Sequence, residues 1–183
     1  GILDDEILIG HVGRFMYQKN HEFLIDIFET LHQMNKKAKL ILIGEGDTES
    51  KIREKVRTLG LSDSVIFAGV RNDVNCCMQA MDLFLLPSLF EGLPVVGIEA
   101  QAAGLPCLMS DTITKETNLF GLVEFASLRN SPEMWADKIM SILVNFSRKD
   151  TTDEMTLNGY NTKEQESSLV NIYSILQSRN AME

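Results

Sequence analysis

Hydrophobic and polar positions along this chain form two kinds of segment. Short continuous apolar runs are typical of strands buried on both faces of a sheet, and apolar residues three or four positions apart are typical of amphipathic helices. The runs predict strands at Ile7–Gly13, Lys39–Ile43, Val65–Phe67, Leu83–Leu86, Pro106–Met109 and, as a candidate, Leu122–Phe125. The helical spacing predicts helices at His21–Met34, Asp47–Leu59, Val74–Met81, Pro94–Ala103, Pro132–Val144 and Thr162–Leu176.

Glycine and proline residues mark several ends of these segments. Pro87 stops one strand, Gly60 follows one helix, and the helix that begins at Pro94 is followed by Gly104. Proline is favoured in the first turn of a helix, and glycine is favoured just after its end. The polar stretch Lys149–Asn161 contains no proline, and we interpret it as a connection between helices.

Strands that alternate with helices indicate a parallel sheet with helices on both faces. The predicted fold class is α/β, a Rossmann-like three-layer domain with a parallel sheet of about six strands. Open sheets of this kind bind ligands at the carboxyl ends of their strands, near a topological switch point. The loops to search for a site are therefore Arg14–Asn20, Gly44–Asp47, Gly69–Asn72, Pro87–Pro94 and Ser110–Glu116.

Composition narrows the class of function. The chain has 183 residues, of which 44% are hydrophobic and 23% charged, and this is enough apolar material for one globular core. Its formal net charge of −9 argues against non-specific nucleic-acid binding, which depends on Lys and Arg neutralising phosphates. A local phosphate site stays open, because such a site requires only one or two cations.

Cysteine use and targeting signals bear on location. Cys76, Cys77 and Cys107 form neither a disulfide framework nor a CxxC metal motif, and the apolar run around Cys107 is typical of a buried thiol. This usage favours a reducing compartment, the cytosol. The sequence has no apolar run of membrane-spanning length and no signal peptide. It begins at Gly1 without methionine, so we expect it to be part of a longer protein.

The first candidate site follows the first predicted strand. Gly13 lets a ligand approach the backbone, Arg14 offers a bidentate fork for phosphate oxygens, and Lys19 offers a point charge. Two cations at the carboxyl end of a buried strand suit a diphosphate. The alternative is that both are solvated surface side chains.

The second candidate site is the segment Ser88–Glu99, in which a loop leads into the helix that begins at Pro94. Helix N-termini present unpaired N–H groups that attract anions, and Gly92 permits close backbone approach. Glu91 suits sugar hydroxyls, although it could also be an ordinary loop carboxylate. Glu99 could bind a ribose diol. Because the helix is apolar nearly all round, we expect Glu99 to be buried and to need a partner.

The segment Phe67–Asn72 follows the third strand, and its backbone could pair with the edge of a nucleobase. It could equally be a plain turn in which Asn72 caps the next helix. The three histidines, His11, His21 and His32, are scattered without metal-binding spacing, so we predict no metal site. No serine or cysteine has a histidine at the spacing of a nucleophilic triad.

Five segments together resemble the GT-B retaining glycosyltransferases called group 1, or family 4. They are GHVGRF at 10–15, KN at 19–20, LILIGEGD at 40–47, VIFAGVRNDV at 65–74 and DLFLLPSLFEGLPVVGIEAQAAGLPCLMSD at 82–111. The last segment contains the E-x7-E signature of that family as Glu91 and Glu99. The resemblance extends over residues 5–180, and the tail with SPEMWADKI is similar to bacterial members that build capsule or exopolysaccharide.

The resemblance implies roles for the matching residues. Arg14 and Lys19 would bind the donor diphosphate and stabilise charge on the leaving nucleotide, and Glu91 would hold the hydroxyls of the transferred sugar. Glu99 would bind the ribose, Val70 and Arg71 would line the base pocket, and the loop at 92–94 would bind phosphate or sugar. The donor-binding positions other than Glu99 are Gly13, Val70, Arg71, Gly92, Leu93 and Pro94. The family needs no metal or other cofactor, because cations and a helix dipole stabilise the leaving diphosphate.

The resemblance also implies a domain organisation. GT-B enzymes have two Rossmann-like domains with the active site between them, so residues 1–183 would be the C-terminal, nucleotide-sugar-binding domain. The N-terminal, acceptor-binding domain would be absent from this chain. The expected partners are a nucleotide-sugar donor and that missing domain, with no nucleic acid. We expect the full-length enzyme in the cytoplasm, peripheral at the inner face of the membrane, while the base (UDP, GDP or ADP), sugar and acceptor stay open.

Two other functions compete with this interpretation. A non-hydrolysing nucleotide-sugar epimerase shares the GT-B architecture, but it requires further acid and base residues, and no histidine lies near Glu91 in the sequence. A non-catalytic α/β module is the second alternative. A receiver domain would need clustered aspartates where Arg14 and Phe15 stand, so a degenerate transferase domain that acts as a scaffold is the form that stays open.

Overall fold

The computed structural model describes residues 2–160, 166–167, 170–171 and 173–174. Contacts between residues divide the chain into two compact units, residues 1–149 and residues 150–183. The second unit contains the short helix α6 (Thr152–Leu157). The first unit carries every strand among the described residues and every predicted site residue.

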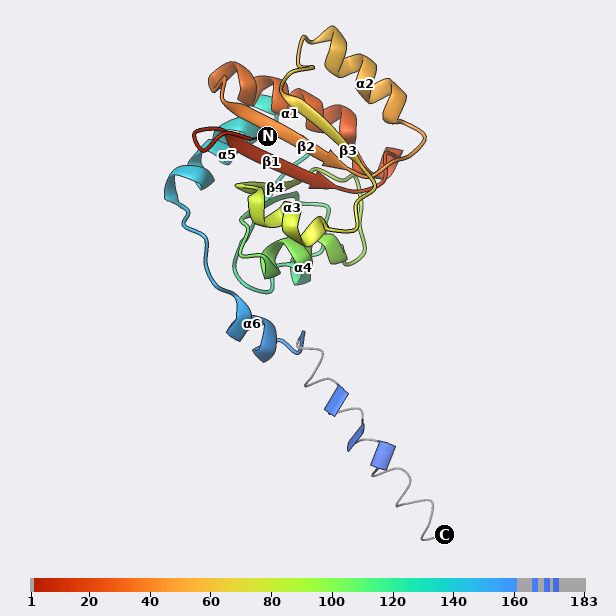
Figure 1. Cartoon of the computed structure of the whole chain (residues 1–183), viewed down its shortest axis with the longest axis vertical. Coiled ribbons are helices and arrows are strands. Elements are labelled where there is room, and N and C mark those ends of the chain that lie inside the picture. The colour runs from red at the N-terminus through yellow and green to blue at the C-terminus, as the bar shows by residue number, and fades with distance from the viewer. Residues whose placement is uncertain (1, 161–165, 168–169, 172, 175–183) are drawn as a thin grey trace. The chain divides into compact units, whose positions relative to one another are not determined.

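One sheet of six parallel strands forms the centre of the first unit, in the order β3-β2-β1-β4-β5-β6 (Figure 1). The strands are β1 (Ile7–Val12), β2 (Ala38–Ile43), β3 (Val65–Gly69), β4 (Leu83–Leu86), β5 (Cys107–Ser110) and β6 (Val123–Ala126). In the register, Ile9 of β1 lies opposite Leu40 of β2 and Leu83 of β4. The strand order reverses between β1 and β4, which makes this pair the topological switch point.

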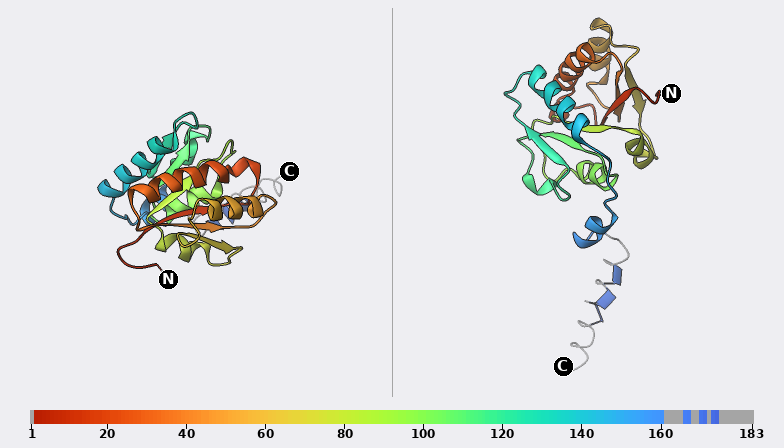
Figure 2. Two further views of the ribbon diagram at one scale, coloured as in Figure 1. Left: turned by 90° about the horizontal axis from the view of Figure 1, so that it is seen from above. Right: turned by 90° about the vertical axis from the view of Figure 1, so that its left-hand side faces the viewer.

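Helices cover both faces of the sheet (Figures 1 and 2). One face packs against α1 (His21–Met34), α2 (Glu49–Thr58) and α5 (Pro132–Asn145). The other face packs against α3 (Val74–Ala80) and α4 (Val95–Ala102). The predicted Rossmann-like, three-layer fold is confirmed.

Alternation along the central strands builds two hydrophobic cores. Ile9 and Leu83 point to the cluster under α1 and α5, and their neighbours Leu8 and Phe84 point to the cluster under α3 and α4. Successive side chains of a strand face opposite sides of the sheet, so a continuous apolar run is needed to fill both cores. Trp135 of α5 is fully buried in the first core, and its indole N–H donates to Ser127 O at 3.0 Å.

The predicted elements agree with the structure as far as α5, and their ends differ by two residues or fewer. Two short 3-10 helices were not predicted, η1 (Tyr17–Lys19) and η2 (Lys115–Thr117). The segment Lys149–Asn161, interpreted as a connection between helices, contains α6, which was not predicted, and the division between the two units falls at its start. Asp150 stands before the N-cap residue Thr151, and it accepts hydrogen bonds from the backbone and hydroxyl of Thr152, which form a local turn at the start of α6. The predicted helix Thr162–Leu176 falls largely outside the described residues.

The glycines expected to follow helices have the expected conformation. Gly60 and Gly104 have φ of 69° and 67°, the left-handed region that a glycine enters without steric cost. Cys107 is buried in β5 as expected, and burial raises the pKa of its thiol. In the described part of the chain, each helix is too short or too polar to span a lipid bilayer.

Candidate functional site

The candidate site lies at the carboxyl ends of β1 and β4, which are neighbours at the middle of the sheet. The chain leaves β1 toward α1 on one face and leaves β4 toward α4 on the other. The loops at 13–20 and 87–94 therefore separate at the switch point, where open α/β sheets bind their ligands. The first and second candidate sites of the sequence meet at this place.

An ion pair joins the two loops. Lys19 Nζ lies 2.6 Å from Glu91 Oε1, and the two side chains are only 14% and 9% exposed. Ser88 Oγ donates to the same carboxylate oxygen at 2.8 Å, and Gln18 Nε2 donates to Glu91 Oε2 at 3.0 Å. The partial burial strengthens these charged hydrogen bonds compared with a pair in water. Two residues predicted to be catalytic are thus in direct contact.

Gln18 and Ser88 were not predicted as partners of Glu91. Each stands beside a predicted residue or segment, since Gln18 precedes Lys19 and Ser88 begins the segment that leads to α4. Their types carry no chemical signal on their own, because a glutamine or serine in a loop is ordinarily solvated. The contacts depend on how the two loops are placed against each other.

Further hydrogen bonds fix that placement. The amide of Leu89 donates to Gln18 O at 2.8 Å, and Asn20 Nδ2 donates to Pro87 O at 3.0 Å. Asn20 has φ of 56°, a left-handed conformation in which asparagine is among the best tolerated residues after glycine. Asn20 ends η1 and precedes α1, so its conformation sets the angle between α1 and the 3-10 helix that contains Lys19.

Arg14 lies on the same loop, outside the ion pair of Lys19 and Glu91. Its side chain is exposed, and it forms no ion pair with any residue that the structure describes. The neighbouring Phe15 is buried, and its amide donates to Glu45 O at 3.0 Å, which holds the loop so that Arg14 faces solvent. A Cβ on Gly13 would lie 3.0 Å from Lys19 Cε, so Gly13 leaves room for the lysine side chain.

Two histidines lie behind these loops. The ring centroids of His11 and His21 are 4.7 Å apart, and both residues are buried. Burial, followed by the proximity of His21, lowers the pKa of His11 well below its usual value. Burial, followed by the nearby Lys19, lowers the pKa of His21 to about 4. The rings are therefore neutral at pH 7, and the described residues contain no cluster that could hold a metal.

The expected burial of Glu99 is wrong, because its side chain is exposed. The short helix α4 packs one side on the sheet and leaves the other side in water, where Val95 is exposed together with Glu99. The buried polar residue of α4 is instead Gln101, which is 0% exposed. Its Nε2 donates to Thr117 O at 2.7 Å and to Gly97 O at 3.0 Å. A buried polar group on this helix does have partners, but it is a structural amide.

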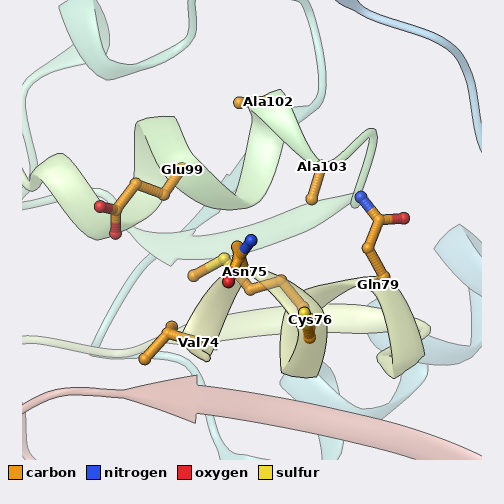
Figure 3. A pocket seen from close by; sticks show the side chains of 8 residues that line it. Val74, Asn75, Cys76, Gln79, Glu99, Ala102 and Ala103 are labelled. Atoms are coloured by element: carbon orange, nitrogen blue, oxygen red, sulfur yellow. The ribbon is translucent and has the colours of Figure 1, made fainter. Parts of the chain in front are cut away.

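Glu99 borders a pocket between α3 and α4 (Figure 3). The pocket has a volume of about 320 Å³ and is lined by Val74, Asn75, Cys76, Met78, Gln79, Glu99, Ala102 and Ala103. Figure 3 shows the Glu99 carboxylate at one end of this groove and Gln79 at the other. The acidic side chain thus stands at the open side of a mainly apolar recess.

Val70 and Arg71 lie in the loop just before α3 and do not belong to that lining. Both are exposed, and Arg71 makes a bidentate pair with Asp73 at 2.6 and 2.7 Å. This guanidinium holds the pKa of Asp73 below its usual value. The alternative in which Asn72 caps α3 is wrong, because Asp73 occupies the N-cap position and its carboxylate binds Arg71 instead of the helix amides.

The loop at 92–94 leads directly into α4. Gly92 is exposed, and a Cβ placed on it would meet nothing within 4 Å, so the backbone here is open to a ligand. Leu93 is 47% exposed, whereas Pro94 is buried and stands as the residue before the helix. The first turn of a helix leaves amide groups without helical partners, and these favour an anion.

Comparison with known proteins places this arrangement in a family. The model of the family described as glycosyl transferases group 1 matches residues 1–161. EpsF of Bacillus subtilis (strain 168), named as a candidate glycosyltransferase, is 38% identical over 178 residues, which are 96% of this chain and 46% of EpsF. The chain thus spans about half the length of this relative.

Solved structures share the fold. The C-terminal domain of LpcC, a glycosyl transferase group 1 family protein from Francisella tularensis, is 20% identical with a TM-score of 0.68 and covers 84% of this chain and 86% of its own. HepE of Anabaena, solved in complex with UDP and glucose, is 19% identical with a TM-score of 0.72 and covers 91% of this chain and 48% of its own. At these identities the likeness establishes the fold.

Proposed function

This chain belongs to the glycosyl transferases group 1 family, and from that premise we propose that it is the donor-binding domain of a retaining glycosyltransferase. In this proposal the full enzyme transfers a sugar from a nucleoside-diphosphate sugar to an acceptor. The observation that carries it is the meeting of Lys19 and Glu91 at the switch point, beside the start of α4. A cation, a carboxylate and a helix N-terminus together suit a diphosphate joined to a sugar.

Each charged residue has a role that its environment supports. Arg14, exposed and without an ion-pair partner among the described residues, is available to the diphosphate, and Lys19 stands on the same loop. Glu91 accepts hydrogen bonds from the sugar hydroxyls. Glu99, exposed at the rim of the pocket between α3 and α4, binds the ribose diol, and the loop at Val70 and Arg71 borders the base.

The leaving group requires charge stabilisation. As the bond between sugar and diphosphate breaks, negative charge grows on the phosphate oxygens, and Arg14 and Lys19 stabilise it together with the N-terminus of α4. Gly13 leaves room for the Lys19 side chain, Gly92 lets the backbone approach those oxygens, and Leu93 and Pro94 shape the loop. In this proposal no metal ion takes part.

The remaining parts of the enzyme lie outside this chain. We propose that an N-terminal domain binds the acceptor and closes the site, since relatives such as EpsF are about twice as long as this chain. Cell-surface polysaccharide synthesis is the proposed process, in the cytoplasm at the inner face of the membrane. HepE, the fold relative solved with UDP and glucose, makes UDP the first nucleotide to test.

Isothermal titration calorimetry of the chain with UDP, GDP and ADP tests the proposal. We expect one of them to bind, and we expect Arg14→Ala to weaken that binding about tenfold, because one charge-assisted contact to phosphate is lost. The matched control is Arg57→Ala, an exposed arginine of α2 that pairs with Glu54 within its own helix. The proposal is wrong if the wild-type chain binds none of the three, or if Arg14→Ala binds as well as the control.

A further inference from the structure

We propose that Gln18 is a positioning residue, which holds the Glu91 carboxylate in place when Lys19 turns to the donor diphosphate. The inference rests on the proposed function, in which Lys19 binds phosphate and Glu91 binds the sugar. In the structure these two side chains bind each other at 2.6 Å. A lysine engaged by phosphate oxygens gives up part of that contact, so Glu91 needs another support in order to face the sugar.

The two oxygens of Glu91 have different donors. Oε1 accepts from Lys19 Nζ at 2.6 Å and from Ser88 Oγ at 2.8 Å, and Oε2 accepts from Gln18 Nε2 at 3.0 Å. The Glu91 side chain is only 9% exposed, and a carboxylate so little solvated depends on its donors. When Lys19 leaves, Ser88 and Gln18 fix the carboxylate at both oxygens and so set its plane.

Gln18 is itself held to the segment that carries Glu91. Its Nε2 also donates to Phe90 O at 2.9 Å, and its backbone carbonyl accepts from the amide of Leu89 at 2.8 Å. The amide side chain is thus bonded to Phe90 and Glu91 and cannot turn away from one without losing the other. Because it carries no charge, it neither competes for the phosphate nor neutralises Glu91.

Ser88 is the second support, and it is anchored from another strand. Its side chain is fully buried, and its backbone carbonyl accepts from Ser110 Oγ at 2.6 Å and from Thr112 Oγ1 at 3.1 Å. The end of β5 therefore fixes Ser88, whereas η1 fixes Gln18. Of the two supports, Gln18 is the one on the same loop as Lys19, and so it holds the sugar-binding carboxylate next to the phosphate-binding lysine.

Calorimetry on the 183-residue chain can distinguish a role in positioning Glu91 for the sugar from a role in supporting the whole site. The probes are UDP with UDP-glucose, GDP with GDP-mannose, and ADP with ADP-glucose. For the pair that binds, we expect Gln18→Ala to weaken the nucleotide sugar about tenfold and to change the affinity for the diphosphate by less than about twofold. The matched control is Gln33→Ala, an exposed glutamine of α1 that donates to Glu29 at 3.3 Å and should change neither affinity.

A double-mutant cycle with Glu91→Ala shows whether Gln18 acts through Glu91. We expect Glu91→Ala to weaken the nucleotide sugar, and we expect Gln18→Ala to add nothing in that background. An additive effect overturns the inference, as does an equal loss for diphosphate and nucleotide sugar, or a Gln18→Ala variant that behaves like Gln33→Ala. In those cases nucleotide binding by the wild type still supports the proposed function.

Two further outcomes would bear on the proposed function or on the role of Glu91. If the wild-type chain binds none of the probes, the proposed function is wrong and the inference falls with it. If the chain binds the diphosphate and the nucleotide sugar equally, and Glu91→Ala changes neither, then Glu91 does not bind the sugar. That result overturns the inference while nucleotide binding stands.

Discussion

His11 and His21 show how neighbours set the charge of a residue behind the site. His11 Nδ1 donates to Leu85 O at 2.9 Å, whereas both ring nitrogens of His21 lack a hydrogen-bond partner among the described residues. His21 stacks on Phe15 with ring centroids 4.2 Å apart. A protonated ring here would place a charge in an apolar layer beneath the cation of Lys19, so both histidines stay neutral.

The chain should therefore become less stable at acidic pH. Because the pKa of His21 is lowered from 6.5 to about 4, the unfolded state binds the proton more readily than the folded state. The stability that comes from a neutral His21 is complete above pH 6.5 and is lost as the pH falls toward 4. The free energy of unfolding should decrease by roughly 2–3 kcal/mol over this range. Urea unfolding between pH 7 and pH 4 measures it. His21→Phe should flatten this dependence; an unchanged slope would contradict the assignment.

At the scale of elements, the backbone of the turn after β2 packs closely against the backbone of the loop after β1. Gly44 has φ of 135°, and a Cβ placed there would lie 2.2 Å from the carbonyl oxygen of Gly13. Gly44 N donates to Gly69 O at 2.8 Å, so the ends of β1, β2 and β3 meet at this point. The contact is between backbones, and neither side can rotate away as a side chain can. The placement of Arg14 depends on it.

Replacing Gly44 should affect both fold and site. We expect Gly44→Ala to destabilise the chain by about 3 kcal/mol, because strained backbone and steric overlap add, and also to weaken nucleotide binding. The matched control is Gly60→Ala, at a φ of 69° with nothing within 4 Å, which should cost about 1–2 kcal/mol and leave binding unchanged. Thermal unfolding and calorimetry of both variants decide the matter. Equal effects would show that the contact with Gly13 has no special role.

At the scale of the whole molecule, the first unit contains its own core. The buried members of both hydrophobic clusters lie between Leu8 and Ile142, inside the unit of residues 1–149. Every residue proposed to bind the donor lies between Gly13 and Glu99. Neither the core nor the proposed site requires a described residue of the second unit, so folding and donor binding should be properties of the first unit.

A chain shortened to residues 1–149 tests this division. We expect it to unfold cooperatively, with a midpoint within about 5 °C of the full chain, because no described residue after Lys149 belongs to either hydrophobic cluster. We also expect it to bind the same nucleotide with the same affinity. Circular dichroism during heating, followed by calorimetry, provides both measurements. A gradual melt, or a large loss of affinity, would show that residues 150–183 complete the core or the site.

The sequence by itself determined the six strands, the helices as far as α5, the parallel sheet and the loops in which the candidate site lies. These follow from local periodicity and from where glycine and proline stand, and local signals of this kind need no knowledge of distant contacts. Arg14, Lys19 and Glu91 could be chosen as candidates because each is a charged residue in a loop that follows a buried strand, and their roles stay predictions.

Only the tertiary structure decided which of these groups touch. Lys19 and Glu91 are 72 positions apart, and their contact depends on the order of β1 and β4 in the sheet. The placement of the two loops also makes Gln18 a donor to Glu91. The packing of α4 on the sheet leaves Glu99 exposed and buries Gln101. Hydrogen bonds and burial depend on distances and directions in space. A pattern along the chain predicts such contacts only between residues that are close in sequence.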